Sequence, residues 1–321
     1  MIEVRVRETR KEADAVVGFL LEPISGEPLP EWDPGAHIDV EVTTADGQTV
    51  LRQYSLCGDV ADPFWRIAVL DAPDSRGGSR AMHAEIETGQ VIRVSEPRNN
   101  FPLHEGDAPA VLIAGGIGVT PLVPMAKELH RRGVAFRMHY QYRSAAAAAL
   151  LEELKGEPFA ESVTFGADVE LDPKKAIKAA LESADPKGHF YVCGPAGFIE
   201  AAEIAAASAG FSAHRIHREL FSAAQASVDA DDDEEFELVL AESGFSVFVP
   251  PGKSAVAALE EVGVDVPVSC EQGVCGSCLT KVLEGEPDHR DAFLMPEERK
   301  RGDYFTPCCS RSKSERLVVA L

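Results

Sequence analysis

One segment decides the fold of the C-terminal part of the chain, and it reads Ser269-Cys270-Glu271-Gln272-Gly273-Val274-Cys275-Gly276-Ser277-Cys278. Its cysteines are spaced C-x4-C-x2-C, and the pair Cys308-Cys309 follows further along the chain. This is the plant-type ferredoxin spacing, in which four thiolates hold a [2Fe–2S] cluster. Gly273 and Gly276 permit the positive φ and the close backbone approach that a loop around a small inorganic core requires. The spacing predicts a [2Fe–2S] cluster on Cys270, Cys275, Cys278 and either Cys308 or Cys309.

A structural zinc site is the alternative for these cysteines. Zinc sites commonly take two separate C-x2-C pairs, whereas this chain has one close triplet and one distant ligand, so the iron–sulfur interpretation is preferred. The chain holds seven cysteines, an odd number, and its N-terminus has no apolar stretch typical of a secretory signal. We therefore expect a cytoplasmic protein in which cysteines bind metal or take part in catalysis rather than form a disulfide framework.

Residues 236–321 are expected to form a small domain around the cysteine segment. Strands are predicted at 236–241 and 246–249, and a helix near 254–262. An acidic stretch within residues 222–235 comes before this domain. Such a run cannot bury a core, so residues 227–235 are predicted to be a solvated linker.

Two further domains are expected upstream. Strands alternate with helices over residues 105–226, which indicates an α/β domain with a parallel sheet. Its predicted strands are 109–114, 135–140 and 188–193, and its predicted helices are 122–132, 145–154 and 198–209. Residues 1–104 instead contain short strands separated by Gly, Pro and Asp, which is typical of an antiparallel β-barrel. The predicted strands of this barrel are 3–9, 16–22, 37–42, 53–57, 65–70 and 91–95.

The composition limits the classes of partner. The chain has 321 residues, enough for two or three domains, and a formal net charge of −22. No basic stripe is available to neutralise phosphates, which argues against nucleic acid binding. The acidity is compatible with a basic protein partner, although solubility is the simpler explanation. The apolar runs are too short to span a bilayer.

The central domain carries two glycine-containing segments, each joining a predicted strand to a predicted helix. The first is Gly115-Gly116-Ile117-Gly118-Val119-Thr120-Pro121, and the second is Cys193-Gly194-Pro195. The first departs from the G-x-G-x-x-G fingerprint, and a structural turn is the alternative. Glycines at this point bring a helix N-terminus close to a pyrophosphate, and ligands of open α/β sheets bind at the carboxyl ends of the strands. Together the segments predict a nicotinamide site faced by Cys193, rather than an ordinary buried cysteine.

The barrel carries a third pair of segments. Arg52-Gln53-Tyr54-Ser55-Leu56 follows a predicted strand, and alone it is compatible with an ordinary one. It gains weight from Ser75-Arg76-Gly77-Gly78-Ser79-Arg80, which comes before a predicted helix. Consecutive glycines there expose N–H groups that suit a phosphate, and Arg76, Arg80 and the Ser79 hydroxyl add donors. A plain glycine turn is the alternative.

These segments, in this order, resemble those of the phthalate dioxygenase reductase family over essentially the whole chain. The resemblance implies an N-terminal flavin barrel, a central NAD domain and a C-terminal ferredoxin-type β-grasp domain of α+β class. It implies Cys308 as the fourth cluster ligand, because Cys308-Cys309-Ser310-Arg311 matches the family's C-x-S-R ending. Glu219-Leu220-Phe221 is similar to the Glu-x-Phe that ends the NAD domain, and 99–103 is similar to the loop before that domain.

The resemblance also implies which residues bind each cofactor. The flavin positions are Arg52, Tyr54, Ser55, Val69, Gly77, Gly78, Ser79, Arg80 and Phe221. The NAD positions are Gly115, Gly116, Gly118, Thr120, Pro121, Cys193, Gly194 and Pro195. The metal ligands are Cys270, Cys275, Cys278 and Cys308. Ser55, beside the reactive part of the flavin, and Cys193, facing the nicotinamide, are the expected catalytic positions.

The implied function is electron transfer. NADH delivers two electrons together, a [2Fe–2S] cluster takes one at a time, and a flavin can connect the two. The expected flavin is FMN, with FAD as the alternative, and Arg143 leaves NADPH open as the donor. The expected acceptor is a terminal oxygenase, of the Rieske non-haem iron type or a cytochrome P450. A stand-alone flavin reductase and a redox sensor are competing interpretations. We expect a monomer in which no histidine acts as a general base.

Overall fold

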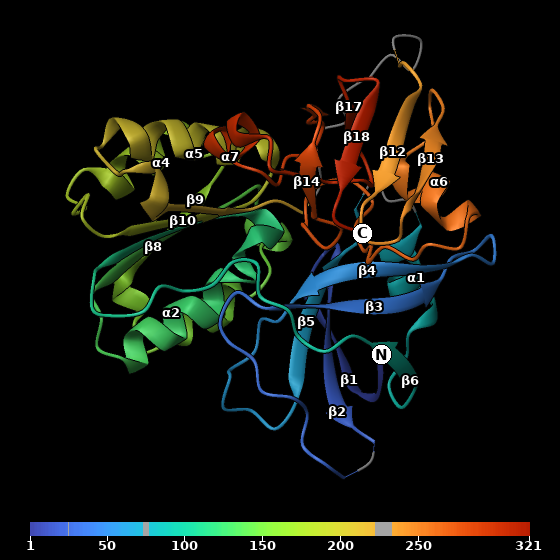
Figure 1. The fold of residues 1–321 in the computed structure, drawn as a ribbon. Helices are drawn as coiled ribbons and strands as arrows, with labels where there is room; N and C mark the ends of the chain where they lie inside the picture. The colour runs from blue at the N-terminus through green and yellow to red at the C-terminus, as the bar shows by residue number, and fades with distance from the viewer. Residues whose placement is uncertain (25, 73–76, 222–232) are drawn as a thin grey trace. The chain divides into compact units, whose positions relative to one another are not determined.

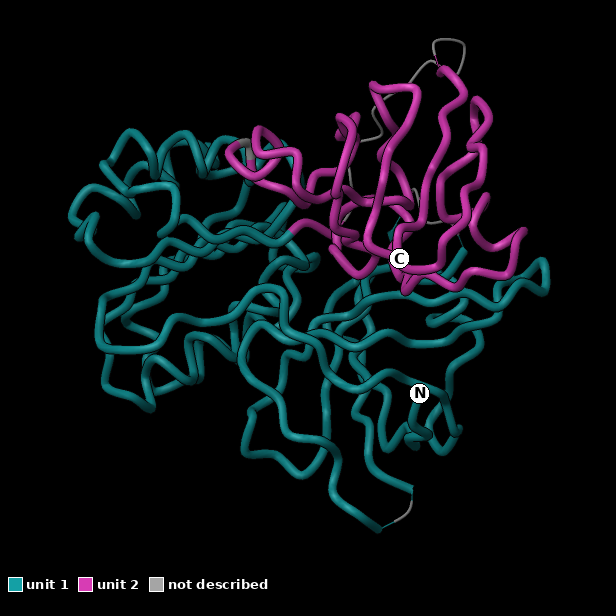
Figure 2. Tube along the Cα trace, in the orientation of Figure 1, with its two compact units in different colours: residues 1–219 teal, residues 220–321 magenta. Residues whose placement is uncertain are grey.

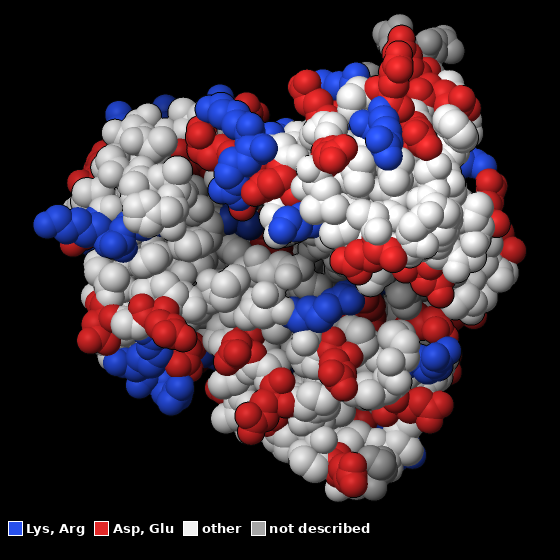
Figure 3. All heavy atoms as spheres, in the orientation of Figure 1, with Lys and Arg blue, Asp and Glu red and all other residues white. Residues whose placement is uncertain are grey.

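The computed structural model describes residues 1–24, 26–72, 77–221 and 233–321. The chain divides into two compact units, Met1–Glu219 and Leu220–Leu321 (Figure 2). The predicted linker at 227–235 lies outside the described residues up to position 232. Within the described ranges, no helix has the length and apolar character that crossing a bilayer would require. On the face shown in Figure 3, acidic and basic side chains are interspersed.

The N-terminal part of the first unit is an antiparallel sheet that closes on itself. Its strands run in the order β4-β3-β6-β1-β2-β5. They are β1 (Ile2–Ala13), β2 (Val16–Pro23), β3 (His37–Thr43), β4 (Thr49–Ser55), β5 (Trp65–Leu70) and β6 (Val91–Val94). A bridge between Leu56 and Ile67 joins the two outer strands, so the expected barrel is present. Helix α1 (Gly78–Glu85) packs on it, and side chains such as Phe19, Trp65 and Ile67 form its core.

The second part of this unit is a parallel sheet with the strand order β11-β10-β7-β8-β9. These strands are β7 (Ala110–Gly115), β8 (Phe136–Tyr142), β9 (Val163–Ala167), β10 (His189–Cys193) and β11 (Ile216–Glu219). The helices are α2 (Leu122–Arg131), α3 (Leu151–Gly156), α4 (Pro173–Leu181) and α5 (Ala196–Ser208), with α4 and α5 on one side of the sheet and α2 on the other (Figure 1). Since β7 and β10 are neighbours, the two glycine-containing segments meet at one edge of the sheet.

Buried charges join the barrel to the parallel-sheet part. Arg66 on β5 lies 2.8 Å from Glu12 of β1 and 2.5 Å from Glu153 of α3. Glu153 also pairs with Lys127 of α2 at 2.9 Å. Removing one partner of a buried ion pair is strongly destabilising, because the other charge is left uncompensated. This network fixes the two sheets of the first unit relative to each other.

The second unit contains a mixed sheet in the order β13-β12-β18-β14-β16. Its strands are β12 (Phe236–Leu240), β13 (Phe245–Val249), β14 (Thr280–Glu284), β16 (Tyr304–Phe305) and β18 (Arg316–Val319), and β15 (Pro287–Asp288) pairs with β17 (Arg311–Ser312) apart from it. Helix α6 (Ala255–Glu261) packs on this sheet, and α7 (Pro296–Arg301) follows the cysteine segment. Strands β12 and β18 are parallel, while the other pairs of the sheet are antiparallel. This is the expected α+β arrangement.

The predicted helix at 145–154 is wrong in its extent. A 3-10 turn occupies Ala145–Ala147, and α3 starts only at Leu151. Between them Leu150 has a φ of 57°, a left-handed conformation that ends any continuous helix. The side chain of Leu150 is almost fully buried, which compensates for this strain. The alanine run therefore forms a bend rather than a helix.

Candidate functional site

The two nicotinamide segments are in backbone contact. Gly115 ends β7, Gly116 begins the 3-10 helix η1 (Gly116–Val119), and Cys193 ends β10. A Cβ atom on Gly118 would lie 2.3 Å from the carbonyl oxygen of Cys193. A Cβ atom on Gly194 would lie 3.0 Å from the Cα atom of Gly115. These glycines are therefore required by close approach, and segments predicted separately form one surface at the carboxyl edge of the sheet.

The remaining nicotinamide positions shape the ends of the helices. Thr120 is buried, and its hydroxyl donates to the carbonyl oxygen of Ile117 at 2.9 Å. Pro121 comes directly before α2, and Pro195 directly before α5. Proline suits a helix start because it has no N–H to leave unpaired there. The N-termini of both helices are thus available for an anionic ligand.

The two flavin segments are also brought together. A Cβ atom on Gly78 would lie 2.5 Å from Nε of Arg52, so the guanidinium of Arg52 packs against the first residue of α1. Gly77 comes before α1 with a φ of 91°, which only glycine adopts readily. The Arg52 side chain also donates to the carbonyl oxygen of Leu51 at 2.8 Å. One cationic side chain thus lies beside the N-terminus of a helix, an arrangement that suits a phosphate.

Tyr54 supplies an observation that fits a bound group. Its hydroxyl is buried and has no hydrogen-bond partner among the described residues. Burial raises the pKa of this phenol, so it stays a neutral donor. A buried tyrosine hydroxyl normally finds a partner. A flavin beside Tyr54 would provide one.

Other predicted flavin positions differ in what surrounds them. Ser79 and Arg80 lie in the first turn of α1, with Arg80 exposed and the Ser79 hydroxyl accepting from the backbone N–H of Ala72 at 3.4 Å. Val69 is fully buried in the barrel core, and its carbonyl oxygen lies 2.8 Å from Nε2 of His83. Phe221 belongs to the second unit and is 41% exposed. Cofactor contacts of these residues stay predictions.

Three polar groups from distant parts of the first unit converge between barrel and parallel sheet. The hydroxyl of Ser55, at the end of β4, donates to Oε2 of Glu219 at 3.4 Å. Glu219 ends β11 and pairs in register with Cys193 of β10. Glu219 is half-buried as a whole residue, but desolvation of its carboxyl raises the pKa to about 8. Burial, followed by the charge of Glu219, raises the pKa of the Cys193 thiol, so this cysteine is an uncharged neighbour.

Among the four predicted ligands of the second unit, Cys270 interacts with Cys275 and Cys278 with Cys308, while Cys308 also interacts with Cys309. Interaction with Cys270 lowers the pKa of the Cys275 thiol, and interaction with Cys308 lowers that of Cys278. A [2Fe–2S] cluster needs two thiolates for each of two irons. Pairing two by two is the arrangement that a binuclear cluster requires.

Backbone N–H groups of the cysteine loop point at sulfur. Those of Gln272 and Val274 lie 3.4 and 3.5 Å from Sγ of Cys270, and that of Ser277 lies 3.4 Å from Sγ of Cys275. Gly276 has a φ of 70°, and a Cβ atom there would meet the ring of Phe293 at 2.4 Å. Hydrogen bonds to the sulfurs of a cluster favour its more negative, reduced state.

The neighbouring cysteines 308 and 309 differ in their contacts. Cys308 interacts first with Cys278, whereas Sγ of Cys309 lies 3.4 Å from the hydroxyl of Thr306 and 3.9 Å from that of Ser310. A Cβ atom on Gly273 would lie 2.4 Å from Sγ of Cys309. Sγ of Cys309 thus packs against the cysteine loop at Gly273, and Cys308 stays the predicted fourth ligand.

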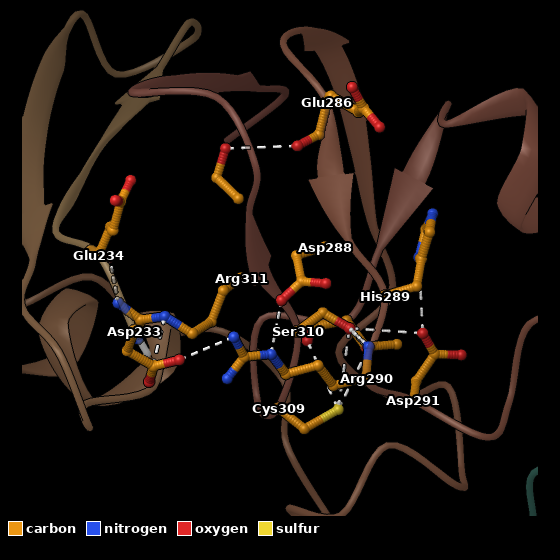
Figure 4. Close-up of polar contacts among 12 residues, drawn as sticks. Asp233, Glu234, Glu286, Asp288, His289, Arg290, Asp291, Cys309, Ser310 and Arg311 are labelled. Atoms are coloured by element: carbon orange, nitrogen blue, oxygen red, sulfur yellow. Dashed lines mark hydrogen bonds and ion pairs between the residues drawn. The ribbon is translucent and has the colours of Figure 1, made fainter. Parts of the chain in front are cut away.

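The residues after the cysteines explain the C-x-S-R pattern (Figure 4). Arg311 is buried and donates to the carbonyl oxygens of Lys253, Glu234, Val249 and Pro250. Its Nε lies 3.4 Å from Asp233, which Arg290 also contacts at 2.7 Å. Arg311 on β17 therefore attaches residues 233–234 to the strand that follows the predicted ligand Cys308.

Asp168 was missed by the sequence interpretation. It follows β9 directly, is exposed, and accepts from Nε2 of Gln141 at 2.8 Å. Gln141 lies on β8, and Arg143 directly follows the end of that strand. The carboxyl ends of both strands thus carry one charge of each sign. A strand predicted at 163–167 would have located Asp168 at its carboxyl end. The alternation of apolar and polar residues is too weak there to predict that strand.

Comparisons with known proteins show what the chain is similar to in sequence and fold. A family model described as a 2Fe-2S iron-sulfur cluster binding domain matches residues 238–313. The chain is 44% identical over 323 residues to vanillate O-demethylase oxidoreductase of Pseudomonas sp. (strain HR199 / DSM 7063), with 100% of both chains covered. It is similar to the structure of phthalate dioxygenase reductase, with a TM-score of 0.72, 33% identity, and 100% and 98% of the two chains covered.

A second solved structure is also similar over the whole of this chain. An intact type IV self-sufficient cytochrome P450 monooxygenase matches with a TM-score of 0.86 and 35% identity. The match covers 100% of this chain and 41% of that longer one. The fold class expected from the sequence is confirmed.

Proposed function

The chain belongs to the phthalate dioxygenase reductase family, and we propose on that basis that it is the reductase component of a multicomponent oxygenase. It takes electrons from NADH and passes them through FMN and a [2Fe–2S] cluster to a terminal oxygenase. The observation that carries this proposal is the presence, on one chain, of a cysteine loop whose backbone N–H groups face sulfur and of a flavin segment whose Ser55 meets Glu219, the neighbour of Cys193. An oxidoreductase that only carried electrons would need no nicotinamide surface.

The nicotinamide surface binds the electron donor. Gly115, Gly116 and Gly118 let the pyrophosphate approach the backbone before α2, and Gly194 and Pro195 shape the opposite side of the same surface. Thr120 and Pro121 hold the start of α2 in place. Cys193 is uncharged and buried at the end of β10, where it limits the space next to the nicotinamide ring.

The flavin surface holds the cofactor against the barrel. Arg52 and the N-terminus of α1 bind its phosphate, with Gly77, Gly78, Ser79 and Arg80 completing the phosphate loop. The unpartnered Tyr54 hydroxyl donates to the flavin. We assign Val69 and Phe221 to the flavin on the family resemblance alone. FMN is the proposed flavin, and FAD is the alternative.

Desolvation raises the pKa of the Glu219 carboxyl to about 8, so this group keeps its proton near neutral pH, although the hydrogen bond from Ser55 opposes the shift. Ser55 therefore lies beside a carboxyl that changes charge near pH 8. The flavin, when bound, accepts two electrons together and releases them singly, which the one-electron cluster on Cys270, Cys275, Cys278 and Cys308 requires. One NADH thus supports two single-electron transfers to the acceptor and releases one proton.

NADH is favoured over NADPH by the charges at the ends of β8 and β9. A 2′-phosphate needs basic residues there. Arg143 offers one positive charge, but Asp168 places a negative one on the neighbouring strand end. The charges of Arg143 and Asp168 cancel, so the ends of β8 and β9 offer no net electrostatic attraction to a 2′-phosphate.

The proposed acceptor is a Rieske non-haem iron oxygenase, and a vanillate-demethylating oxygenase is the first to test, given the name of the 44% identical relative. The cluster unit is acidic, which suits a basic docking surface on the acceptor. Glu271 is exposed on the cysteine loop. Glu298 instead accepts from the N–H of Met295 at 2.8 Å, and Glu297 pairs with Lys300. Charge reversal at Glu271 is therefore the cleanest test of docking.

Anaerobic titration with NADH, followed by absorbance and electron paramagnetic resonance, tests the main proposal. Bleaching of the flavin together with a rhombic [2Fe–2S] signal is the expected result. Bleaching without that signal would leave only a flavin reductase. Chromatography of the released flavin separates FMN from FAD.

A cytochrome P450 is the second candidate acceptor, because a self-sufficient P450 contains a region similar to this whole chain. The two acceptors separate in one experiment. Reduction of a purified Rieske oxygenase and of a purified P450 is compared at equal concentration, and the proposal expects faster reduction of the Rieske protein.

A further inference from the structure

Strand β11 is short and lies at the edge of its sheet, yet it ends in Glu219. None of its four residues is fully buried, so packing alone holds it weakly. We propose that two contacts, one on each face of β11, act as a clamp that positions Glu219 next to Ser55 and Cys193, and that protonation of histidines opens this clamp. The inference rests on the proposed function only for the role of Glu219.

The first contact is aromatic. The ring of His217 stacks on that of Tyr191 with centroids 4.5 Å apart, and its Nε2 lies 2.9 Å from Nδ1 of His189. The ring of His189 stacks in turn on His104, with centroids 4.0 Å apart. Tyr191 and His189 belong to β10, so these contacts attach β11 to the strand that carries Cys193.

The protonation of these rings follows from their partners. Nη1 of Arg215 lies 3.2 Å from Nε2 of His189, and arginine can only donate. Nε2 of His189 must therefore accept, so Nδ1 carries the hydrogen and donates to Nε2 of His217. Both histidines have to be neutral for this chain of hydrogen bonds to exist. A proton added to either ring would place two N–H groups against each other.

The second contact is an ion pair on the other face of the strand. Successive residues of a strand point to opposite faces, so Arg218 points away from the His217 side. Its Nη1 donates to both carboxylate oxygens of Glu203, at 3.2 and 3.1 Å. Glu203 lies on α5, which starts immediately after the Cys193-Gly194-Pro195 segment. The clamp thus ties β11 to both elements that form that segment.

The two contacts of the clamp lie directly before Glu219, the residue that meets Ser55. Glu219 follows His217 and Arg218 directly and is the last residue of the first unit. Its carboxyl reaches Ser55, which lies 164 positions away in the chain. Loosening β11 would let water reach this carboxyl and would remove the desolvation that raises its pKa.

The charges around the histidines make the clamp sensitive to acid. Burial first, then the neighbouring His104, His214 and Arg215, lowers the pKa of both His189 and His217 to about 4. On the other side of His104, Arg132 donates to its carbonyl oxygen, and the pKa of His104 is lowered as well. Because the pKa values of His189 and His217 in the folded protein lie below the ordinary 6.5, these histidines bind protons more readily when the strand is open. The stabilisation is present above about pH 6.5 and is lost as the pH falls toward 4.

Hydrogen–deuterium exchange of the full-length holoprotein tests the clamp. Exchange of peptides covering residues 214–219 is measured at pH 7.5 and pH 5, after correction for intrinsic rates. Wild type should lose protection at pH 5. His217→Gln keeps an acceptor for His189 Nδ1 but cannot titrate, so it should be protected at pH 7.5 and lose less at pH 5. Arg218→Gln should lower protection about five-fold at both pH values, and the exchanged pair Glu203→Arg with Arg218→Glu should restore it.

The link to Glu219 needs a second readout. The rate of flavin reduction by NADH is measured against pH in single-turnover experiments. In Arg218→Gln the pH profile should shift to lower pH, because Glu219 becomes hydrated, and the exchanged pair should return it. If Arg218→Gln lost protection from hydrogen exchange but its pH profile of flavin reduction did not shift, the contacts would be merely structural and the proposal would be overturned. Equal protection of wild type at pH 7.5 and pH 5 would also overturn it. Absence of flavin reduction in wild type would refute the proposed function while leaving the exchange result in force.

Discussion

The cysteine loop and the hydride-transfer surface are built in opposite ways. In the second unit, three predicted ligands lie within ten consecutive positions, and the backbone between them supplies the N–H groups that face sulfur. In the first unit, Ser55 meets Glu219 across 164 positions, and Gly118 meets Cys193 across a sheet. A local site is specified by its spacing, whereas an assembled site is specified by the fold that brings its parts together.

The difference predicts separate failures. A change to a cluster ligand should destroy one site and leave the other working, because no cysteine of the loop is needed to assemble the first unit. A change at a point of close backbone approach should instead displace several groups together. The following experiments test this contrast, beginning with the largest expected effect.

Replacing Cys308 should abolish the cluster completely. Cys308→Ala removes one of two thiolates from an iron, so the visible absorbance and the paramagnetic signal of the cluster should disappear, and acceptor reduction with them. Flavin bleaching by NADH should continue at the wild-type rate, as measured by stopped-flow absorbance. This separation is what a local site requires.

Cys309→Ala is the matched control for Cys308→Ala. Its sulfur packs against Gly273 and Thr306, so the cluster should remain with only a modest loss of stability. If Cys309→Ala lost the cluster and Cys308→Ala kept it, the fourth ligand would be Cys309 rather than Cys308.

Gly118→Ala should disrupt the hydride-transfer surface. The new Cβ atom would lie 2.3 Å from the carbonyl oxygen of Cys193, so η1 and the end of β10 have to separate. A displacement of about 1 Å can cost about 100-fold in rate, and we expect a loss of that order in kcat/KM for NADH. The [2Fe–2S] absorbance should be unchanged, which distinguishes this effect from general unfolding.

Gly197→Ala is the control for the Gly118 substitution. Gly197 lies in α5, only three positions beyond Gly194, and a Cβ atom there would meet nothing within 4 Å. Alanine is the better helix former by about 1 kcal/mol, so this variant should bind NADH normally and be slightly more stable. An equal loss in both variants would contradict the close-contact explanation.

The same contrast explains what could be derived from the sequence. The cysteine spacing predicts the cluster ligands from their order alone, although the contacts of Cys308 and Cys309 could be described only from side-chain positions. The glycine segments and the R-x-Y-S segment were recognisable, but their convergence depended on strand order, with β7 next to β10. Asp168 and the His189–His217 contact were not recognisable, because they depend on strands β9 and β11, which are short and lack a strong pattern of alternation.

Glu219→Gln should affect rate and pH dependence together. The raised pKa of about 8 means that the folded protein keeps this proton where the unfolded chain, near 4.5, has released it. Stability contributed by the protonated form is therefore complete below about pH 4.5 and is lost as the pH rises through 8. Glutamine removes this dependence, so the variant should gain stability relative to wild type between pH 5 and pH 8 in denaturant unfolding.

Flavin reduction gives the kinetic half of that prediction. A positive charge develops on the nicotinamide as hydride leaves, and an ionised Glu219 would stabilise it. The wild-type rate should therefore rise through about pH 8, and Glu219→Gln should be about 100-fold slower above that pH without any such rise. Ser55→Ala is the partner control: it removes a hydrogen bond that lowers the pKa of Glu219, so the rise should move to higher pH. A variant with an unchanged profile would exclude Glu219 from the step.

Asp168→Asn should produce the smallest change, in the choice of nucleotide. Asparagine can still accept from Nε2 of Gln141, so the loop after β9 should keep its conformation while losing one negative charge. Removing that charge from the neighbourhood of a 2′-phosphate is worth about 1 kcal/mol in a solvated position, which corresponds to about a five-fold gain in kcat/KM for NADPH and no change for NADH. Glu170→Gln is the matched control, since Glu170 is exposed in the same loop but accepts no hydrogen bond from Gln141 among the described contacts. An equal gain in kcat/KM for NADPH from both variants would mean that the acidity of the whole loop, rather than the position of Asp168 at the end of its strand, selects the electron donor. Nucleotide choice would then depend less on exact residue positions than cluster binding in the cysteine loop does.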